Sequence, residues 1–169
     1  RSLVVVSGNV DRVMGSGATG APGQPRDEAP IAAWLREVIR PDHTLITICS
    51  GALIAARAGL LDGYACTTHY ECVQELAAIA PRARVLENRL YVEDRNRLTS
   101  AGITSGIDLM LHVVSRLVGH RCALAVARYL VVYLRRGGND PQLSPWLDGR
   151  NHLHPVVHRV QDLMAAEPA

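Results

Sequence analysis

The chain has 169 residues, of which 48% are hydrophobic, and its formal net charge is +2. This composition is that of a globular domain and excludes a disordered segment, and the charge is too small to predict nucleic-acid binding by this segment alone. No apolar run is long enough to cross a membrane, no signal peptide opens the chain, and the four cysteines lack CxxC spacing. We therefore expect a cytoplasmic protein without a membrane partner, a metal or a cofactor.

The chain opens on a strand pattern. Residues 3–6 form a continuous apolar run, which is typical of an inner strand of a parallel sheet, so we expect the N-terminal part of the domain to be missing. Gly8 and Asn9 follow at the carboxyl end of this strand, where α/β folds place ligand contacts. The glycine-rich stretch 14–25 has no Gly-Lys-Ser/Thr ending, so it predicts a surface loop and not a phosphate-binding loop.

Residues 44–63 predict a strand, a tight turn and a helix, with Cys49 in the turn. The β-branched run 44–48 ends at Cys49, and an alanine-rich helix pattern over 51–61 follows. Such an elbow exposes its side chain at the carboxyl edge of a parallel sheet and directs the next helix N-terminus toward it. A helix N-terminus can lower the thiol pKa, as a nucleophile requires. The alternative is that Cys49 is a small buried hydrophobe.

His69 is the candidate partner of this thiol. It follows Cys49 by twenty positions, on a strand-like stretch that one crossover would return to the same sheet edge. A histidine there can serve as a base, although a histidine without a catalytic role is also ordinary at such a place. The backbone amides of Ser50 and of the Gly8-Asn9 turn can bind an anion or form an oxyanion hole.

The other elements follow from periodicity and from turn residues. We expect helices over 31–39, 70–80, 105–117 and 121–134, and short strands over 84–87, 90–93 and 97–100. Ser105 and Asp108 predict a capping box at the start of helix 105–117, which accounts for Asp108 without a catalytic role. The arginines at 121, 128 and 135 predict a solvated stripe on helix 121–134, opposite Leu124, Ala127, Val131 and Leu134.

The character of the sequence changes after residue 134. Residues 135–146 are rich in glycine and proline and lack periodicity, and a new amphipathic helix pattern begins near Pro155. We expect domain boundaries at 1–136, a linker over 137–151, and the start of a truncated second domain over 152–169. Three histidines near this helix could imitate a metal site, but without a fourth ligand they predict a solvated helix start: His152, His154 and His158.

Several motifs resemble the glutamine amidotransferase-like domain found at the N-terminus of many AraC-family transcription regulators. They lie at 48–52, 58–63, 67–69, 98–102 and 106–109. The resemblance spans residues 3 to 136. In addition, 135–144 resembles the interdomain segment of this family, and 154–164 resembles the first helix of the AraC-type helix-turn-helix domain. The superfamily also contains the Parkinson-associated deglycase, intracellular proteases and isonitrile hydratase.

The resemblance implies an α/β, flavodoxin-like, doubly wound and mostly parallel sheet with helices on both faces, followed by the start of an all-α helix-turn-helix domain. It implies an effector-sensing and dimerisation domain of a homodimeric bacterial regulator that binds DNA through its C-terminal domain. A small-molecule effector would bind at Gly8, Asn9, Cys49, Ser50 and His69. One alternative is an isonitrile-hydratase-like or cysteine-hydrolase enzyme, with Cys49 as nucleophile and His69 as the second catalytic candidate. A third possibility is a thiol redox sensor at Cys49.

Overall fold

The fold is built on a four-stranded, mostly parallel sheet. The computed structural model describes residues 2–9, 28–133, 135–143 and 155–166. Strands β1 (Leu3–Ser7), β2 (Thr44–Ile48) and β6 (Arg97–Ser100) run parallel, and β5 (Tyr91–Asp94) pairs with β6 in the antiparallel sense, giving the order β1-β2-β6-β5. A separate two-stranded parallel sheet joins β3 (Ala65–Cys66) to β4 (Arg84–Val85). The mostly parallel α/β architecture is therefore confirmed.

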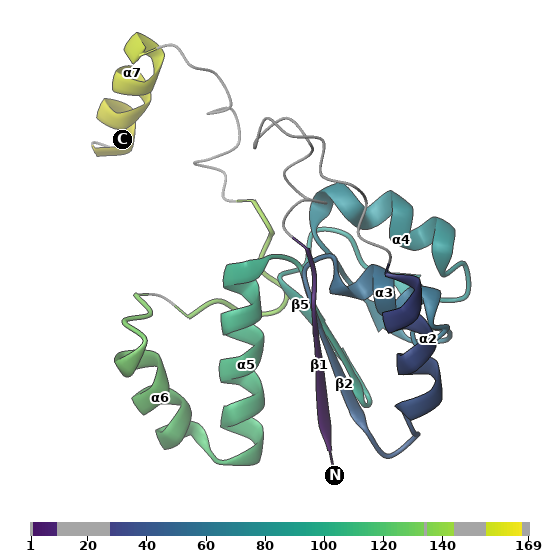
Figure 1. Cartoon of the computed structure of the whole chain (residues 1–169). Coiled ribbons are helices and arrows are strands. Elements are labelled where there is room, and N and C mark those ends of the chain that lie inside the picture. Colours follow the sequence, from purple (N-terminus) through teal and green to yellow (C-terminus); the bar gives the residue numbers. More distant parts are fainter. Residues whose placement is uncertain (1, 10–27, 134, 144–154, 167–169) are drawn as a thin grey trace.

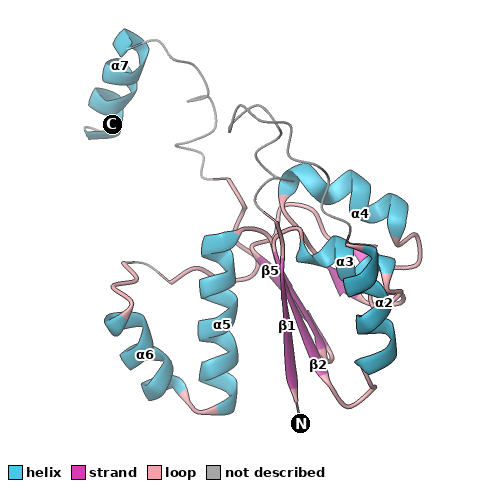
Figure 2. Ribbon diagram, viewed as in Figure 1, coloured by secondary structure: helices cyan, strands magenta, loops and turns pink. Residues whose placement is uncertain are grey.

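Helices cover both faces of the main sheet. Figure 1 shows α2 (Ala29–Val38), α3 (Gly51–Arg57) and α4 (Val73–Ile79) on one side, and α5 (Ile103–Leu117) on the other. Helix α6 (His120–Tyr129) packs against α5 (Figure 2). Within β2, Leu45 faces the α2–α4 layer and Ile46 faces α5, and both side chains are fully buried. Coverage of both faces explains why Leu45 and Ile46 are both apolar. The expectation that residues 3–6 form an inner strand is wrong for the described sheet, because β1 lies at its edge and Leu3 and Val5 are 44% and 50% exposed.

Some element boundaries differ from the sequence-based expectation. Helix α3 ends at Arg57, and a 3₁₀ turn, η1 (Tyr70–Cys72), precedes α4. The helix expected over 121–134 ends at Tyr129, because Val131 adopts a left-handed backbone with φ of 55°. Val131 was expected on the buried face but is 85% exposed, whereas Arg121 and Arg128 are exposed as expected. Position 134 lies outside the described residues.

The expected capping box at Ser105 and Asp108 is wrong in its register. Helix α5 begins at Ile103, and the N-cap is Gly102, whose extended backbone (φ −121°, ψ −175°) starts the helix earlier. Ser105 therefore occupies the third helical position, and its hydroxyl accepts the Gly102 N–H at 2.6 Å. Asp108 takes no part in this cap and instead binds Arg136.

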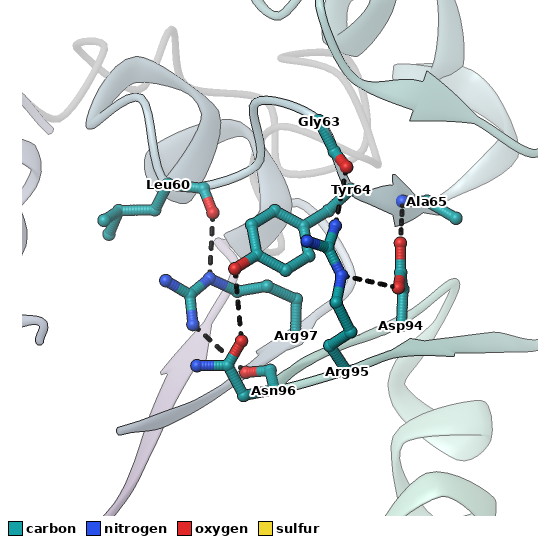
Figure 3. Close-up of polar contacts among 8 residues, drawn as sticks. All are labelled: Leu60, Gly63, Tyr64, Ala65, Asp94, Arg95, Asn96 and Arg97. Atoms are coloured by element: carbon teal, nitrogen blue, oxygen red, sulfur yellow. Dashed lines mark hydrogen bonds and ion pairs between the residues drawn. The ribbon is translucent and has the colours of Figure 1, made fainter. Parts of the chain in front are cut away.

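A polar cluster at the amino end of β6 fixes the second sheet to the first. The Tyr64 ring lies between two guanidinium groups, with the Arg95 carbon 3.8 Å and the Arg97 carbon 5.0 Å from its centroid (Figure 3). Asp94 accepts the Ala65 N–H at 2.7 Å, and the buried Arg97 donates through Nε to the Leu60 carbonyl at 2.9 Å. These contacts hold β3 beside the β5–β6 turn and so fix the chain that leads to His69.

Helix α7 (Pro155–Ala166) matches the amphipathic helix expected near Pro155. Its apolar side chains are exposed at Val156, Val157, Val160, Leu163 and Met164. His158 lies in this helix, whereas the glycine-rich stretch 14–25 and the other two histidines of this region, His152 and His154, fall outside the described residues. Among the described helices, none combines the length and apolarity needed to cross a membrane.

Candidate functional site

Cys49 lies at a strained turn between β2 and α3. Its φ is 57°, a left-handed backbone conformation that is uncommon for a residue with a side chain. The turn is held by two hydrogen bonds to neighbouring elements. The Cys49 N–H donates to the Ser100 carbonyl at 3.0 Å, and the Thr68 hydroxyl donates to the Cys49 carbonyl at 2.9 Å. The strand–turn–helix elbow that the sequence predicted is therefore present.

Two glycines let the end of β1 approach the elbow. A Cβ atom on Gly8 would lie 2.3 Å from Ser50 Oγ and 2.6 Å from Ser50 N, and one on Gly51 would lie 2.4 Å from the Val6 carbonyl oxygen. The contact is closed by hydrogen bonds between Ser50 and Asn9, in which Ser50 Oγ accepts the Asn9 N–H at 3.0 Å and donates to its carbonyl at 3.3 Å. Gly8 and Asn9 thus lie beside the elbow, as their positions after β1 led us to expect.

The Cys49 side chain is buried, although the sequence predicted an exposed side chain at the elbow. Cys49 is only 8% exposed, and burial raises its pKa above the ordinary value. The Ser50 backbone N–H opposes this shift, and the negative charge of Glu71 adds to it. Desolvation therefore outweighs the Ser50 N–H, and the shift in the Cys49 pKa is opposite in direction to the lowering that a nucleophile requires.

His69 lies near the elbow but is engaged by its own turn. It caps η1, where its Nδ1 accepts the Glu71 N–H at 3.4 Å, and its ring contacts the Tyr70 ring at a centroid distance of 4.4 Å. Burial lowers the pKa of His69, so the ring is neutral near pH 7. A neutral ring that accepts through Nδ1 carries its proton on Nε2. Within the described part of the chain, no hydrogen bond joins His69 to Cys49.

The route that brings His69 to the elbow differs from the expected crossover. The stretch before it does not return to the main sheet, since β3 pairs only with β4 among the described strands. Instead, two hydrogen bonds hold the chain beside β6 and the elbow. The Thr67 N–H donates to Thr99 Oγ1 at 2.8 Å, and Thr68 donates to the Cys49 carbonyl. Hydrogen bonds of Thr67 and Thr68, and not strand pairing with the main sheet, therefore bring His69 near Cys49.

A cavity of about 700 Å³ opens at this edge of the sheet. Gly8, Asn9, Cys49 and His69 contribute to its wall. Ser50, which was also predicted to bind the effector, is not among the lining residues and instead hydrogen-bonds to Asn9. The larger part of the wall is apolar and comes from α5 and α6: Ile103, Ile107, Met110, Leu111, Val114 and Val126. The arrangement suits a small molecule with an apolar body and a polar group directed at the elbow. No cluster of three or more metal-ligating side chains occurs among the described residues.

One wall of this cavity was not expected from the sequence. Residues 136, 142 and 143 also line it, although 137–151 was expected to be a linker. Arg136 is fixed by Asp108, which accepts its Nε–H at 2.8 Å and its backbone N–H at 3.2 Å. The pairing joins positions 28 residues apart. No local periodicity signals such a contact, and the expected capping box had already accounted for Asp108 in the sequence.

A mostly parallel α/β sheet with a cysteine elbow defines a domain of the DJ-1 type. The sequence profile of the DJ-1/PfpI family matches residues 4–116, and the chain belongs to this family. It is 34% identical over 133 residues to the HTH-type transcriptional regulator GbdR of Pseudomonas aeruginosa, an alignment that covers 79% of this chain and 36% of the regulator. It is also 35% identical over 89 residues to isonitrile hydratase of Pseudomonas putida, covering 51% of this chain and 36% of that protein.

Solved structures support the same fold. An AraC family transcriptional regulator from Pseudomonas putida aligns with a TM-score of 0.52 and 28% identity, over 65% of this chain and 57% of that one. DJ-1beta of Drosophila melanogaster aligns with a TM-score of 0.58 and 20% identity, over 78% of this chain and 64% of that one. The chain spans about a third of the length of the regulator GbdR.

Proposed function

We propose that this chain is the effector-sensing and dimerisation domain of a bacterial AraC-family transcription regulator. Its effector is a small molecule that occupies the cavity beside Cys49, and the regulator is a homodimer that binds DNA through a helix-turn-helix domain beginning near α7. The proposal is supported by relatives that are HTH-type transcriptional regulators and by an AraC family regulator with the same fold.

The observation that carries the proposal is a mostly apolar cavity with a buried thiol in its wall. A catalytic cysteine acts as a thiolate, usually with a base that accepts its proton. Here burial raises the pKa of Cys49, and the Nδ1 atom of His69 accepts the backbone N–H of Glu71. A protonated thiol in an apolar wall contributes shape and contact area to a binding site, which is what an effector site needs.

Binding to the cavity can be tested on this chain directly. A panel of small metabolites, grouped as amines, carboxylates, zwitterions and neutral alcohols, is screened by thermal shift, and each hit is confirmed by calorimetry. Ile107→Trp places a large ring in the cavity wall, and Ile31→Trp makes the same change on the exposed surface of α2. We expect a hit whose affinity falls at least tenfold in Ile107→Trp and less than twofold in Ile31→Trp. A panel without any hit, or hits that bind Ile107→Trp with the affinity of the parent chain, would overturn the cavity as the effector site.

An enzyme is the second candidate, because the isonitrile hydratase relative and the strained elbow both favour it. In that case Cys49 is the nucleophile and the reaction is the hydration of an isonitrile. A test incubates the chain with a simple alkyl isonitrile and follows its consumption by infrared absorption. Turnover that Cys49→Ala abolishes would establish the enzyme, whereas turnover equal in both proteins, or none, would remove this candidate.

A further inference from the structure

Residues 136–143, here called the wall segment, connect the domain to the rest of the chain and also close the cavity. Arg136, Gln142 and Leu143 line the same cavity as Cys49 and His69. The segment follows α6 and precedes the stretch that leads to α7. A ligand that fills the cavity therefore contacts residues of the wall segment, which connects the domain to the rest of the chain.

The middle of the wall segment is hydrogen-bonded to the start of β5. The Gly138 carbonyl accepts the N–H groups of Leu90 at 3.0 Å and Tyr91 at 3.4 Å, and the Asp140 carbonyl accepts the Leu90 N–H at 3.2 Å. The approach is close enough to require glycine, since a Cβ on Gly138 would lie 2.6 Å from the Tyr91 carbonyl oxygen. The segment is thus docked on the domain in a specific register.

The far end of the wall segment reaches the elbow through two hydrogen bonds in series. Gln142 Nε2 donates to the Thr68 carbonyl at 3.0 Å, and the Thr68 hydroxyl donates to the Cys49 carbonyl at 2.9 Å. The Gln142 backbone N–H also donates to Asn88 Oδ1 at 2.9 Å. Gln142 therefore contacts the same residue that holds the strained turn of the site.

The contacts of the wall segment are suited to opening. Apart from the Arg136–Asp108 pair, they are largely hydrogen bonds near the surface, and most of the segment's side chains are exposed, so little apolar area is lost when residues 137–143 detach. Segments with few buried apolar contacts open at a free energy well below that of global unfolding. Docked and detached forms can therefore both be populated without loss of the fold.

We propose that the wall segment is part of the effector site and that its docking is coupled to occupancy of the cavity, with Gln142 as the residue that links the two. The inference rests on the proposed effector site. An occupant that contacts Gln142 or displaces it from Thr68 changes the balance between docked and detached forms, and this change moves the chain that continues toward α7. Coupling is reciprocal, so weakening the docking also changes access to the cavity.

The effect of weakened docking on access to the cavity can be measured through the alkylation rate of Cys49. In a Cys122→Ser background, which removes the most exposed of the four cysteines, the rate of Cys49 alkylation by iodoacetamide is followed over a range of pH by peptide mass. Gln142→Ala removes the bond to Thr68, and Asn139→Ala removes an exposed amide of the same segment that makes no side-chain hydrogen bond among the described residues. One net hydrogen bond of about 1 kcal/mol corresponds to about a fivefold change in population.

We expect the high-pH plateau rate to rise about fivefold in Gln142→Ala and by less than twofold in Asn139→Ala. A structural opening raises the plateau, whereas a change in the thiol pKa moves the midpoint, so the two causes separate. Equal plateaus for Gln142→Ala and the parent protein, with both folded by circular dichroism, would overturn the inference.

The effect of cavity occupancy on docking is measured with a carboxamidomethyl group on Cys49 as the occupant. Hydrogen exchange is compared before and after complete modification at the amides of Leu90, Tyr91 and Gln142, which report docking, and at Ile46, which reports the sheet. Coupling predicts exchange at the docking amides that changes at least threefold while Ile46 is unchanged. Unchanged exchange at the docking amides would overturn the coupling and leave the effector site itself intact, because metabolite binding and its loss in Ile107→Trp are measured separately.

Discussion

Replacing Gly8 by alanine should disturb the elbow. The new Cβ would lie 2.3 Å from Ser50 Oγ, 2.6 Å from Ser50 N and 2.7 Å from Gly51 N. The hydroxyl can rotate away, but the two nitrogens belong to the backbone that begins α3. The end of β1 must therefore move, and the paired hydrogen bonds between Asn9 and Ser50 lengthen or break.

The cost can be bounded from these contacts. Overpacking in a well-packed site costs about 1–3 kcal/mol. For a domain of this size, each kcal/mol lowers the Tm by about 2–4 °C, so Gly8→Ala should lower it by about 2–12 °C. Gly137→Ala is the matched control, because its Cβ would meet nothing closer than Asp140 Oδ2 at 3.8 Å, an ordinary contact.

The assay is thermal unfolding of the wild type and both variants by calorimetry, combined with the Cys49 alkylation rate as a report on the elbow. We expect Gly137→Ala to stay within about 0.5 kcal/mol of the wild type, as exposed substitutions usually do. A Gly8→Ala protein with the stability and alkylation rate of Gly137→Ala would refute the close approach on which the site geometry depends.

Three further results follow from the site. The pH profile of Cys49 alkylation should give an apparent pKa above the free-thiol value of about 8.5, because burial dominates there. A value well below about 8.5 would instead indicate an activated thiol fit for catalysis or redox sensing. Burial lowers the pKa of His69, so the unfolded chain binds this proton more readily and native stability is lost as the pH falls below about 6.5; in His69→Gln the urea midpoint should decline less between pH 7 and 5.5, and parallel declines would contradict this. Asp108→Asn should cost about 1–2 kcal/mol in urea unfolding, because Asp108 is 3% exposed while its partner Arg136 is 34% exposed and partly screened; an unchanged midpoint would mean that the pair is not formed in solution.

The sequence was sufficient for the parts of the fold that rest on local chemistry. An apolar run that ends at one cysteine and continues into an alanine-rich helix predicted the elbow, and the structure has it at Cys49 with a left-handed backbone. The β-branched run at 44–48 likewise predicted a strand of the parallel sheet, and β2 has Leu45 and Ile46 buried on opposite faces. In each case the signal lies within a few residues of the element that it specifies.

The parts that sequence reasoning missed depend on long-range contacts. The thiol pKa is set by how deeply the fold buries Cys49, which the turn pattern does not reveal. The docking of the wall segment joins Gln142 to Thr68, 74 positions earlier, through a backbone carbonyl that any residue could supply. The register of the α5 cap failed for a local reason, since the extended backbone of Gly102 competes with Ser105 as the start of the helix.

We propose that an effector in the cavity beside Cys49 controls DNA binding by the full-length regulator. The most direct test measures the affinity of the full-length regulator for the DNA upstream of its own gene, at moderate salt, with and without a metabolite that binds the cavity. We expect the metabolite to change the dissociation constant at least fivefold in the wild type and to have no effect in Ile107→Trp, while Ile31→Trp responds like the wild type. A regulator that does not bind DNA, or whose DNA affinity is the same with the cavity filled and empty, would contradict the claim.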